Sequence, residues 1–218
     1  MPNSLPLIVR HLGRAPYAGT VAAMKAFTEA RTPDTPDELW LLEHDSVYTL
    51  GLKCRARPQP EALHGIPVVQ TDRGGDITWH GPGQLVVYTL IDLERLGIGI
   101  RTLVNRMEQS VIDLLAENEL TGERRAGAPG VYVGGAKVAA LGLRIRRGAT
   151  YHGLALNIDP DLAAFSRIDP CGYAGLAVTS LRQLGVDLPA DDIGHRLVRR
   201  LSGLLGYTAR VSSTATPT

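Results

Sequence analysis

The sequence predicts an α+β fold, a mixed and largely antiparallel β-sheet flanked by α-helices. Short apolar or β-branched runs bounded by Gly, Pro and Asp recur along the chain, which is typical of strands. Three segments carry apolar residues at helical spacing. The expected strands come in consecutive groups with helices between the groups, whereas a parallel sheet would show strict β-α alternation. Because no break in composition divides the 218 residues, we expect one domain over residues 1–211.

The first part of the chain predicts one helix among several strands. A strand is expected at residues 5–10, and a helix follows it and ends near Thr32-Pro33. The apolar residues at helical spacing in that helix are Tyr17, Val21, Met24 and Phe27. Short β-branched or apolar runs then predict strands at residues 38–44, 47–51, 67–71 and, beyond a glycine-rich segment, 85–92.

The second part predicts two further helices around a meander of strands. The strongest helix signal is an apolar stripe at Ile100, Leu103, Val104, Met107, Val111, Leu114 and Leu115. Strands are expected at residues 130–133, 137–146 and 149–158, the first two joined by the hairpin loop Gly134-Gly135-Ala136. A last amphipathic helix spans residues 193–204, and the polar residues 212–218 are expected to form a disordered tail.

Composition argues against several function classes. The formal net charge of +1, from 23 basic and 22 acidic residues, argues against a general nucleic-acid binder. The N-terminus lacks a secretion signal and no run of about eighteen apolar residues occurs, so we expect a cytoplasmic protein without a membrane segment. Two cysteines far apart in the sequence fit neither a metal site nor a disulfide framework.

The segment from Arg73 to Gln84, RGGDITWHGPGQ, is the most informative part of the chain. Glycines allow positive φ or the close approach of another backbone or a ligand, and here they flank the polar side chains of Arg73, Asp76, Thr78 and His80. A long structured turn is the alternative, because loops rich in Gly and Pro are common. We favour a functional site.

Lys137 and Cys171 are the two candidate catalytic residues. In the strand 137–146, Lys137 lies on the same face as Ala139, Leu141, Leu143 and Ile145, although lysine is seldom buried without a partner. A solvated ammonium on a buried stem is the alternative. Cys171 lies among Pro and Gly in an irregular loop, where reactive groups are often found, whereas Cys54 has no such surroundings and is interpreted as incidental.

These residues resemble the lipoyl(octanoyl)transferase family, LipB type, of the biotin and lipoate protein ligase superfamily. The resemblance extends over most of the chain, about residues 38–184, and no motif residue is missing. Five motifs carry it: RGGDITWHGPGQ at 73–84, PGVYV at 129–133 leading to Lys137, LGLRIRRG at 141–148, HGLALN at 152–157 and RIDPCGYAG at 167–175.

The resemblance implies transfer of an octanoyl group from acyl carrier protein to a lysine of lipoyl domains. The acceptors would be the lipoyl domains of 2-oxoacid dehydrogenase complexes and the glycine cleavage H protein. It implies a thioester on Cys171, activation of that thiol by Lys137, and no cofactor. His80 and His152 are candidate acid–base groups or site lining. Implied substrate contacts are Arg73, Gly74, Gly75, Asp76, Ile77, Thr78, Trp79, His80, Ala140, Leu141, Gly142, Gly153, Leu154 and Ala155.

Acyl carrier proteins are acidic, so a basic patch should receive the donor. Two groups of arginines could supply it, and a merely solvated face is the alternative for either. They are Arg144, Arg146 and Arg147, or Arg101 and Arg106.

Three other functions compete with octanoyl transfer. An ATP-dependent lipoate ligase of the same fold would need no cysteine, but residues 130–137 do not match a phosphate loop, because Val138 stands where Ser or Thr is required. A hydrolase could combine Cys171 with His80 or His152. A scaffold that only docks lipoyl domains would bind them without acylation.

Overall fold

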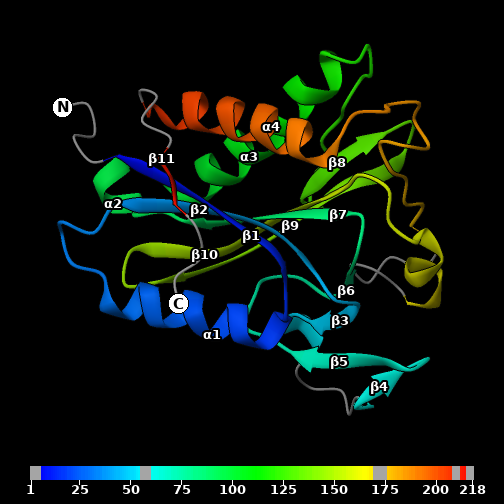
Figure 1. Cartoon of the computed structure of the whole chain (residues 1–218), viewed down its shortest axis with the longest axis horizontal. Helices are drawn as coiled ribbons and strands as arrows, with labels where there is room; N and C mark the ends of the chain where they lie inside the picture. Colours follow the sequence, from blue (N-terminus) through cyan, green and yellow to red (C-terminus); the bar gives the residue numbers. More distant parts are fainter. Residues whose placement is uncertain (1–5, 55–59, 169–175, 208–211, 215–218) are drawn as a thin grey trace.

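A seven-stranded sheet forms the centre of the molecule (Figure 1). The computed structural model describes residues 6–54, 60–168, 176–207 and 212–214. The strand order is β11-β1-β2-β7-β10-β9-β8, in which β1 pairs parallel with β2 and β11 and all other neighbours are antiparallel. The strands are β1 Leu7–Ala15, β2 Asp37–His44, β7 Gln84–Leu90, β8 Gly130–Val133, β9 Ala136–Arg146, β10 Ala149–Asn157 and β11 Ser212–Thr214.

A second, four-stranded sheet lies beside the first and has the order β4-β5-β3-β6. Its strands are β3 Val47–Leu50, β4 Ala62–Leu63, β5 Ile66–Gln70 and β6 Ile77–His80, and the short helix η1 Leu52–Cys54 follows β3. The pairs β4–β5 and β3–β6 are antiparallel, whereas β3–β5 is parallel. This small sheet therefore brings the middle of the glycine-rich segment, as β6, next to the central sheet.

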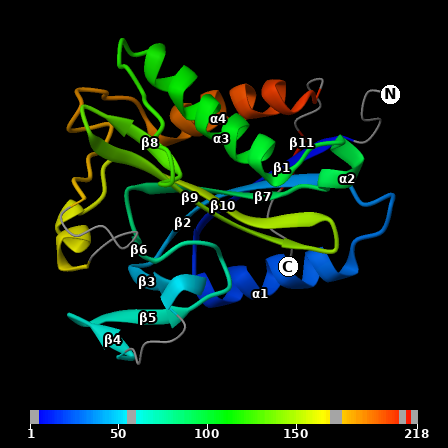
Figure 2. The same cartoon turned by 180° about the vertical axis from the view of Figure 1, so that it is seen from behind.

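Helices cover both faces of the central sheet. Figures 1 and 2 show α3 Ile100–Ala116 and α4 Ala190–Leu205 on one face and α1 Tyr17–Ala30 on the other. Two shorter helices, α2 Leu93–Leu96 and η2 Leu162–Arg167, connect strands and helices. The predicted stripe of α3 packs into the core, where Leu103, Met107 and Val111 are fully buried. Each such side chain stabilises the fold by roughly 1.5–3 kcal/mol.

The predicted fold class is confirmed, with differences at the sheet edges. The strand expected at residues 5–10 continues to Ala15 and pairs parallel with β2, although antiparallel runs were expected. Ser212–Thr214, in the tail for which disorder was expected, form β11 beside β1. Polar Ser and Thr give no strand periodicity, so that pairing depends on an available sheet edge. In the described chain, no helix is long and apolar enough to span a bilayer.

Candidate active site

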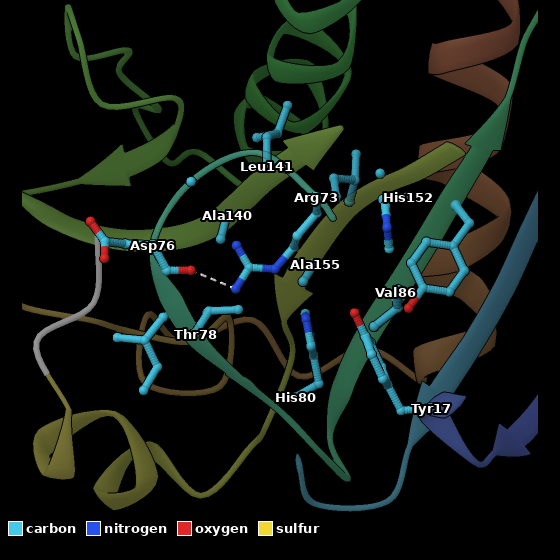
Figure 3. Close-up of a pocket in the computed structure, with 16 residues that line it drawn as sticks. Tyr17, Arg73, Asp76, Thr78, His80, Val86, Ala140, Leu141, His152 and Ala155 are labelled. Atoms are coloured by element: carbon cyan, nitrogen blue, oxygen red, sulfur yellow. Dashed lines mark hydrogen bonds between the residues drawn. The ribbon is translucent and has the colours of Figure 1, made fainter. Parts of the chain in front are cut away.

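A pocket lies where the small sheet meets the central sheet, between the Arg73 turn, the start of α1 and strands β6, β7, β9 and β10 (Figure 3). Counting its open mouth, it contains about 530 Å³ of empty space. His152 and all the expected substrate contacts line it except Gly74 and Trp79. Trp79 instead packs against Tyr48 and Phe165 in a separate core cluster. Three segments far apart in the sequence are therefore brought together as expected.

Arg73 shapes the glycine-rich turn from inside. The side chain is buried and donates to Thr49 O at 2.7 Å, to Asp76 O at 2.7 Å and to Gly74 O at 2.9 Å. Figure 3 shows the bond from Arg73 to Asp76 O as a dashed line. Because three backbone carbonyls accept hydrogen bonds from the Arg73 guanidinium, this side chain stabilises the conformation of the turn. Arg73 contributes to the site by fixing residues 73–76 as well as by its charge.

Glycine at position 142 lets the Arg73 turn approach β9. Gly74 N donates to Leu143 O at 3.0 Å, and a Cβ on Gly142 would lie 3.1 Å from Gly74 O. Such a contact is tighter than a larger residue tolerates without a shift of the turn. On β10, a Cβ on Gly153 would lie 1.9 Å from Val87 O. The close pairing of β10 with β7 therefore requires glycine at position 153, whereas a larger residue at position 142 would displace the Arg73 turn slightly.

His80 is buried in the pocket as a neutral imidazole. Its Nδ1 lies 2.7 Å from Gln84 Oε1, and its ring stacks 6.0 Å from that of Tyr17. Burial, followed by the charges of His44 and Arg73, lowers the pKa of His80 to about 3. An imidazole with so low a pKa accepts hydrogen bonds but is a weak general base at neutral pH.

His152 has a strained backbone and a carboxylate partner. Its φ of 61° is unusual for a residue other than glycine, and such strain is often concentrated at functional sites. His152 Nε2 lies 3.0 Å from Asp72 Oδ1, and Asp72 also accepts from the Tyr151 hydroxyl and pairs with Lys25 at 3.1 Å. Burial lowers the pKa of His152 despite this carboxylate. The hydrogen bond from His152 is the main cause of a lowered pKa at Asp72.

Sequence reasoning missed the aromatic wall of the pocket. Tyr17, Val86 and Tyr88 line it, together with the expected residues. His44 Nδ1 lies 2.7 Å from Ala15 O, so it must donate there, and His44 Nε2 then accepts from Tyr88 OH at 2.6 Å. The alternation of β7 places Val86 and Tyr88 on one face, but only the packing of the two sheets makes that face the pocket wall.

Lys137 is buried, as its position on the apolar face predicted, and lies outside the pocket lining. Its Nζ is 3.3 Å from Pro129 O and 5.2 Å from the centre of the Tyr132 ring. The backbone of Lys137 donates to Ala177 O at 2.8 Å and accepts from Thr179 N at 3.0 Å. Residues 177–179 therefore run along the start of β9.

Cys171 lies outside the described residues, so its expected contact with Lys137 stays a prediction. Ala177, which pairs with Lys137, is six positions further along the sequence. At up to about 3.6 Å per residue, the covalent chain allows at most roughly 22 Å between the Cα atoms of Cys171 and Ala177. Cys54 is buried, and its thiol donates to Asp76 Oδ1 at 3.0 Å, so it supports a residue of the pocket mouth.

The sequence resembles proteins named octanoyltransferase. The relative from Thiobacillus denitrificans is 60% identical over 195 residues, which cover 89% of this chain and 89% of that protein. The relative from Pseudomonas putida is 52% identical over 212 residues, 97% of this chain and 98% of that protein. The relative from Dechloromonas aromatica is 54% identical over 200 residues, 90% and 96%.

Solved structures show the same fold at low identity. A lipoate-protein ligase A bound with ATP matches with a TM-score of 0.74 at 16% identity, over 96% of this chain and 89% of that one. The biotin protein ligase of Aquifex aeolicus, in complex with biotin and ATP, matches with a TM-score of 0.56 at 13% identity, over 91% and 69%. These likenesses support the fold alone, so they do not favour the ligase over the transferase.

The family profile of the lipoyl protein ligase A/B catalytic domain matches residues 16–202, which include the pocket lining, the small sheet and all strands of the central sheet except β1 and β11. Because that match spans most of the chain and relatives more than half identical align nearly end to end, this protein belongs to the lipoyl protein ligase A/B catalytic domain family.

Proposed function

We propose that this protein transfers an octanoyl group from acyl carrier protein to a lysine of lipoyl domains. One observation carries the proposal: most of the substrate contacts implied by the octanoyltransferase resemblance line one pocket, in a chain 52–60% identical to proteins of that name. The acceptors are the lipoyl domains of 2-oxoacid dehydrogenases and the glycine cleavage H protein. The reaction takes place in the cytoplasm and needs no cofactor.

In the first half-reaction, the Cys171 thiolate attacks the thioester carbonyl of the donor. A new C–S bond forms to Cys171, the bond to the carrier sulfur breaks, and the carrier thiol takes up a proton. The Lys137 ammonium stabilises the Cys171 thiolate, because a nearby positive charge favours the charged form of a thiol. The shallow burial of residues 140–142 at the pocket mouth suits them to lie beside the reacting carbonyl.

In the second half-reaction, the amine of the acceptor lysine attacks the acyl-Cys171 thioester. The C–N bond forms, the C–S bond breaks, the proton released by the amine passes to water, and Lys137 again stabilises the charge that develops on sulfur. One cation therefore assists both steps. His80 and His152 act as site lining in this scheme, because burial lowers the pKa of both and makes them weak bases for an ammonium group.

The octanoyl chain occupies the apolar part of the pocket. Val86, Ala140, Leu141, Leu154 and Ala155 line that part. Burial of six methylenes at about 0.8 kcal/mol each would contribute roughly 5 kcal/mol to binding.

The tip of the β9–β10 hairpin receives the acidic donor. Arg144, Arg146 and Arg147 are exposed there, around Ile145, whose side chain is 42% exposed. Leu143, the residue before this tip, bonds to the Arg73 turn and so links the tip to the pocket. The alternative patch, Arg101 and Arg106, lies on α3, which covers the opposite face of the central sheet from α1 (Figure 1).

Intact-mass measurement after mixing with octanoyl carrier protein tests the proposal. We expect one octanoyl adduct that maps to Cys171, is lost in Cys171→Ala, and passes to a lipoyl domain without ATP. The matched control is Cys54→Ala, which should keep the adduct. Lys137→Met should slow adduct formation and transfer by at least about a hundredfold. An enzyme that needs ATP, or that acylates the lipoyl domain normally with Cys171→Ala, would overturn the proposal.

A further inference from the structure

A chain of buried hydrogen bonds connects the pocket to the segment that pairs with Lys137. His80 Nδ1 lies 2.7 Å from Gln84 Oε1, and Gln84 Nε2 donates to Asn157 Oδ1 at 2.9 Å. Asn157 Nδ2 donates to Thr179 O at 3.0 Å. Gln84 and Asn157 are 1% and 4% exposed and face each other across the β7–β10 ladder. Neither residue is needed for the reaction scheme above.

The backbone carbonyl of Thr179 determines the direction of every hydrogen bond in the series His80–Gln84–Asn157–Thr179. A backbone carbonyl can only accept, so Asn157 must present its NH2 group to Thr179. The Asn157 oxygen then faces Gln84, which must donate, and the Gln84 oxygen faces His80. His80 Nδ1 therefore carries the hydrogen, and its Nε2 keeps the lone pair. Side-chain amides are ordinarily ambiguous in orientation, but here the geometry leaves one assignment.

Residues 177–181, which accept the last hydrogen bond of this series, also bind the backbones of β9 and β10. Thr179 N donates to Lys137 O at 3.0 Å, and Leu181 N donates to Asn157 O at 2.9 Å. The pairing with β9 is an isolated parallel bridge between Lys137 and Val178, not a full ladder. The bond from the Asn157 side chain to Thr179 O adds to three backbone bonds, at Ala177, Thr179 and Leu181, that attach this segment to β9 and β10. Residues 177–181 follow directly after the part of the sequence that contains Cys171.

We propose that Gln84 and Asn157 are positioning residues, which hold the segment after Cys171 in register with Lys137 and fix the hydrogen of His80 on Nδ1. The proposal rests on the proposed function, because it assumes that Cys171 and Lys137 act as a pair. Loss of the amide donor of Asn157 leaves Thr179 O without its side-chain partner in a buried site. Residues 177–181 then shift relative to β9, and the thiolate of Cys171 loses part of its stabilisation.

The test is the pH profile of Cys171 alkylation by iodoacetamide, followed by peptide mass spectrometry. Asn157→Asp keeps the shape and the acceptor but removes the donor to Thr179. We expect at least tenfold slower alkylation at pH 6.5 and a profile displaced upwards by about one pH unit, toward that of an ordinary thiol near 8.5. Asn157→Ser keeps a shorter donor and should lie between Asn157→Asp and the wild type. A merely structural residue would change stability without displacing this profile.

Asn118→Asp is the matched control. Asn118 Nδ2 donates to Leu114 O at 2.9 Å in α3, so the same chemical change is made to the same kind of bond outside the site. If Asn157→Asp does not fold, the displacement of the alkylation pH profile in Asn157→Ser tests the positioning role by itself. Folded Asn157 variants that react like the wild type would refute the positioning role. A wild type whose Cys171 takes no octanoyl group would instead refute the proposed function, which keeps the two failures distinct.

Discussion

The buried, neutral His80 predicts a specific loss of stability at mildly acidic pH. Its pKa falls from the ordinary 6.5 to about 3 in the folded protein, mainly because burial disfavours the charged imidazolium. In the unfolded chain, His80 takes up a proton near pH 6.5, whereas the folded chain does not. The free energy of unfolding therefore has its full His80 contribution above pH 6.5, and it decreases as the pH falls from 6.5 toward 3.

The magnitude follows from this difference in pKa. At pH 5.0, about 1.5 pH units below its ordinary pKa, His80 is protonated in the unfolded state but not in the folded state. At 1.36 kcal/mol per pH unit, this protonation lowers the free energy of unfolding by about 2 kcal/mol relative to pH 7.5. Lowered pKa values at His44 and His152 act in the same direction, so the total loss in the wild type is larger. Asp72, whose pKa is lowered from 3.8, contributes nothing in this window, because it is ionised in both states.

Urea unfolding at pH 7.5 and pH 5.0 measures this contribution. His80→Asn keeps a donor for Gln84 but cannot take up a proton, so the loss between the two pH values should be about 2 kcal/mol smaller than in the wild type. His64→Asn, an exposed position outside the site, is the matched substitution and should leave the loss nearly unchanged. If His80→Asn loses as much stability as the wild type, His80 is not held neutral by burial and the reasoning is refuted.

Two further predictions concern residues that stabilise the fold. Gly153→Ala should lower the free energy of unfolding by more than about 2 kcal/mol and impair acyl transfer, because the new Cβ would overlap Val87 O. Gly203→Ala, in α4 with open space around it, should be neutral or raise that energy by up to about 1 kcal/mol; equal effects of the two in urea unfolding would contradict this. Asp37→Ala should lower the free energy of unfolding by about 3–5 kcal/mol, because Asp37 is fully buried, accepts from the Tyr207 hydroxyl and pairs with two arginines. A melting temperature near that of the wild type would show that these partners find other acceptors.

Local patterns predicted the elements that depend on near neighbours. The apolar stripe from Ile100 to Leu115 gave α3 almost to the residue, since helical burial repeats every three to four positions. Glycines and polar residues in the segment 73–84 marked the pocket, because that mixture suits neither a core strand nor a regular helix. The strand that ends in His80 was missed, since its four residues lie inside that segment.

Long-range contacts determined the rest. Gly74 and Trp79 belong to the implied contact set but do not line the pocket, because the backbone of Gly74 faces β9 and the Trp79 ring fills another core. The sequence predicted Tyr17 only as one of the apolar residues of the first helix. It lines the pocket because α1 begins next to His80, which is 63 positions further along the chain (80 − 17).

By itself, the sequence determined the fold class and the main helices, because hydrophobic spacing is a property of neighbouring positions, and its resemblance to a known family implied most of the residues that line the pocket. Tertiary structure alone decided the parallel pairing of β1, the strand at Ser212–Thr214 and the protonation of His80. It also decided the bonds that join Gln84, Asn157 and Thr179. The physical reason is that hydrogen-bond partners and burial depend on what the folded chain brings into contact, and no local pattern records that.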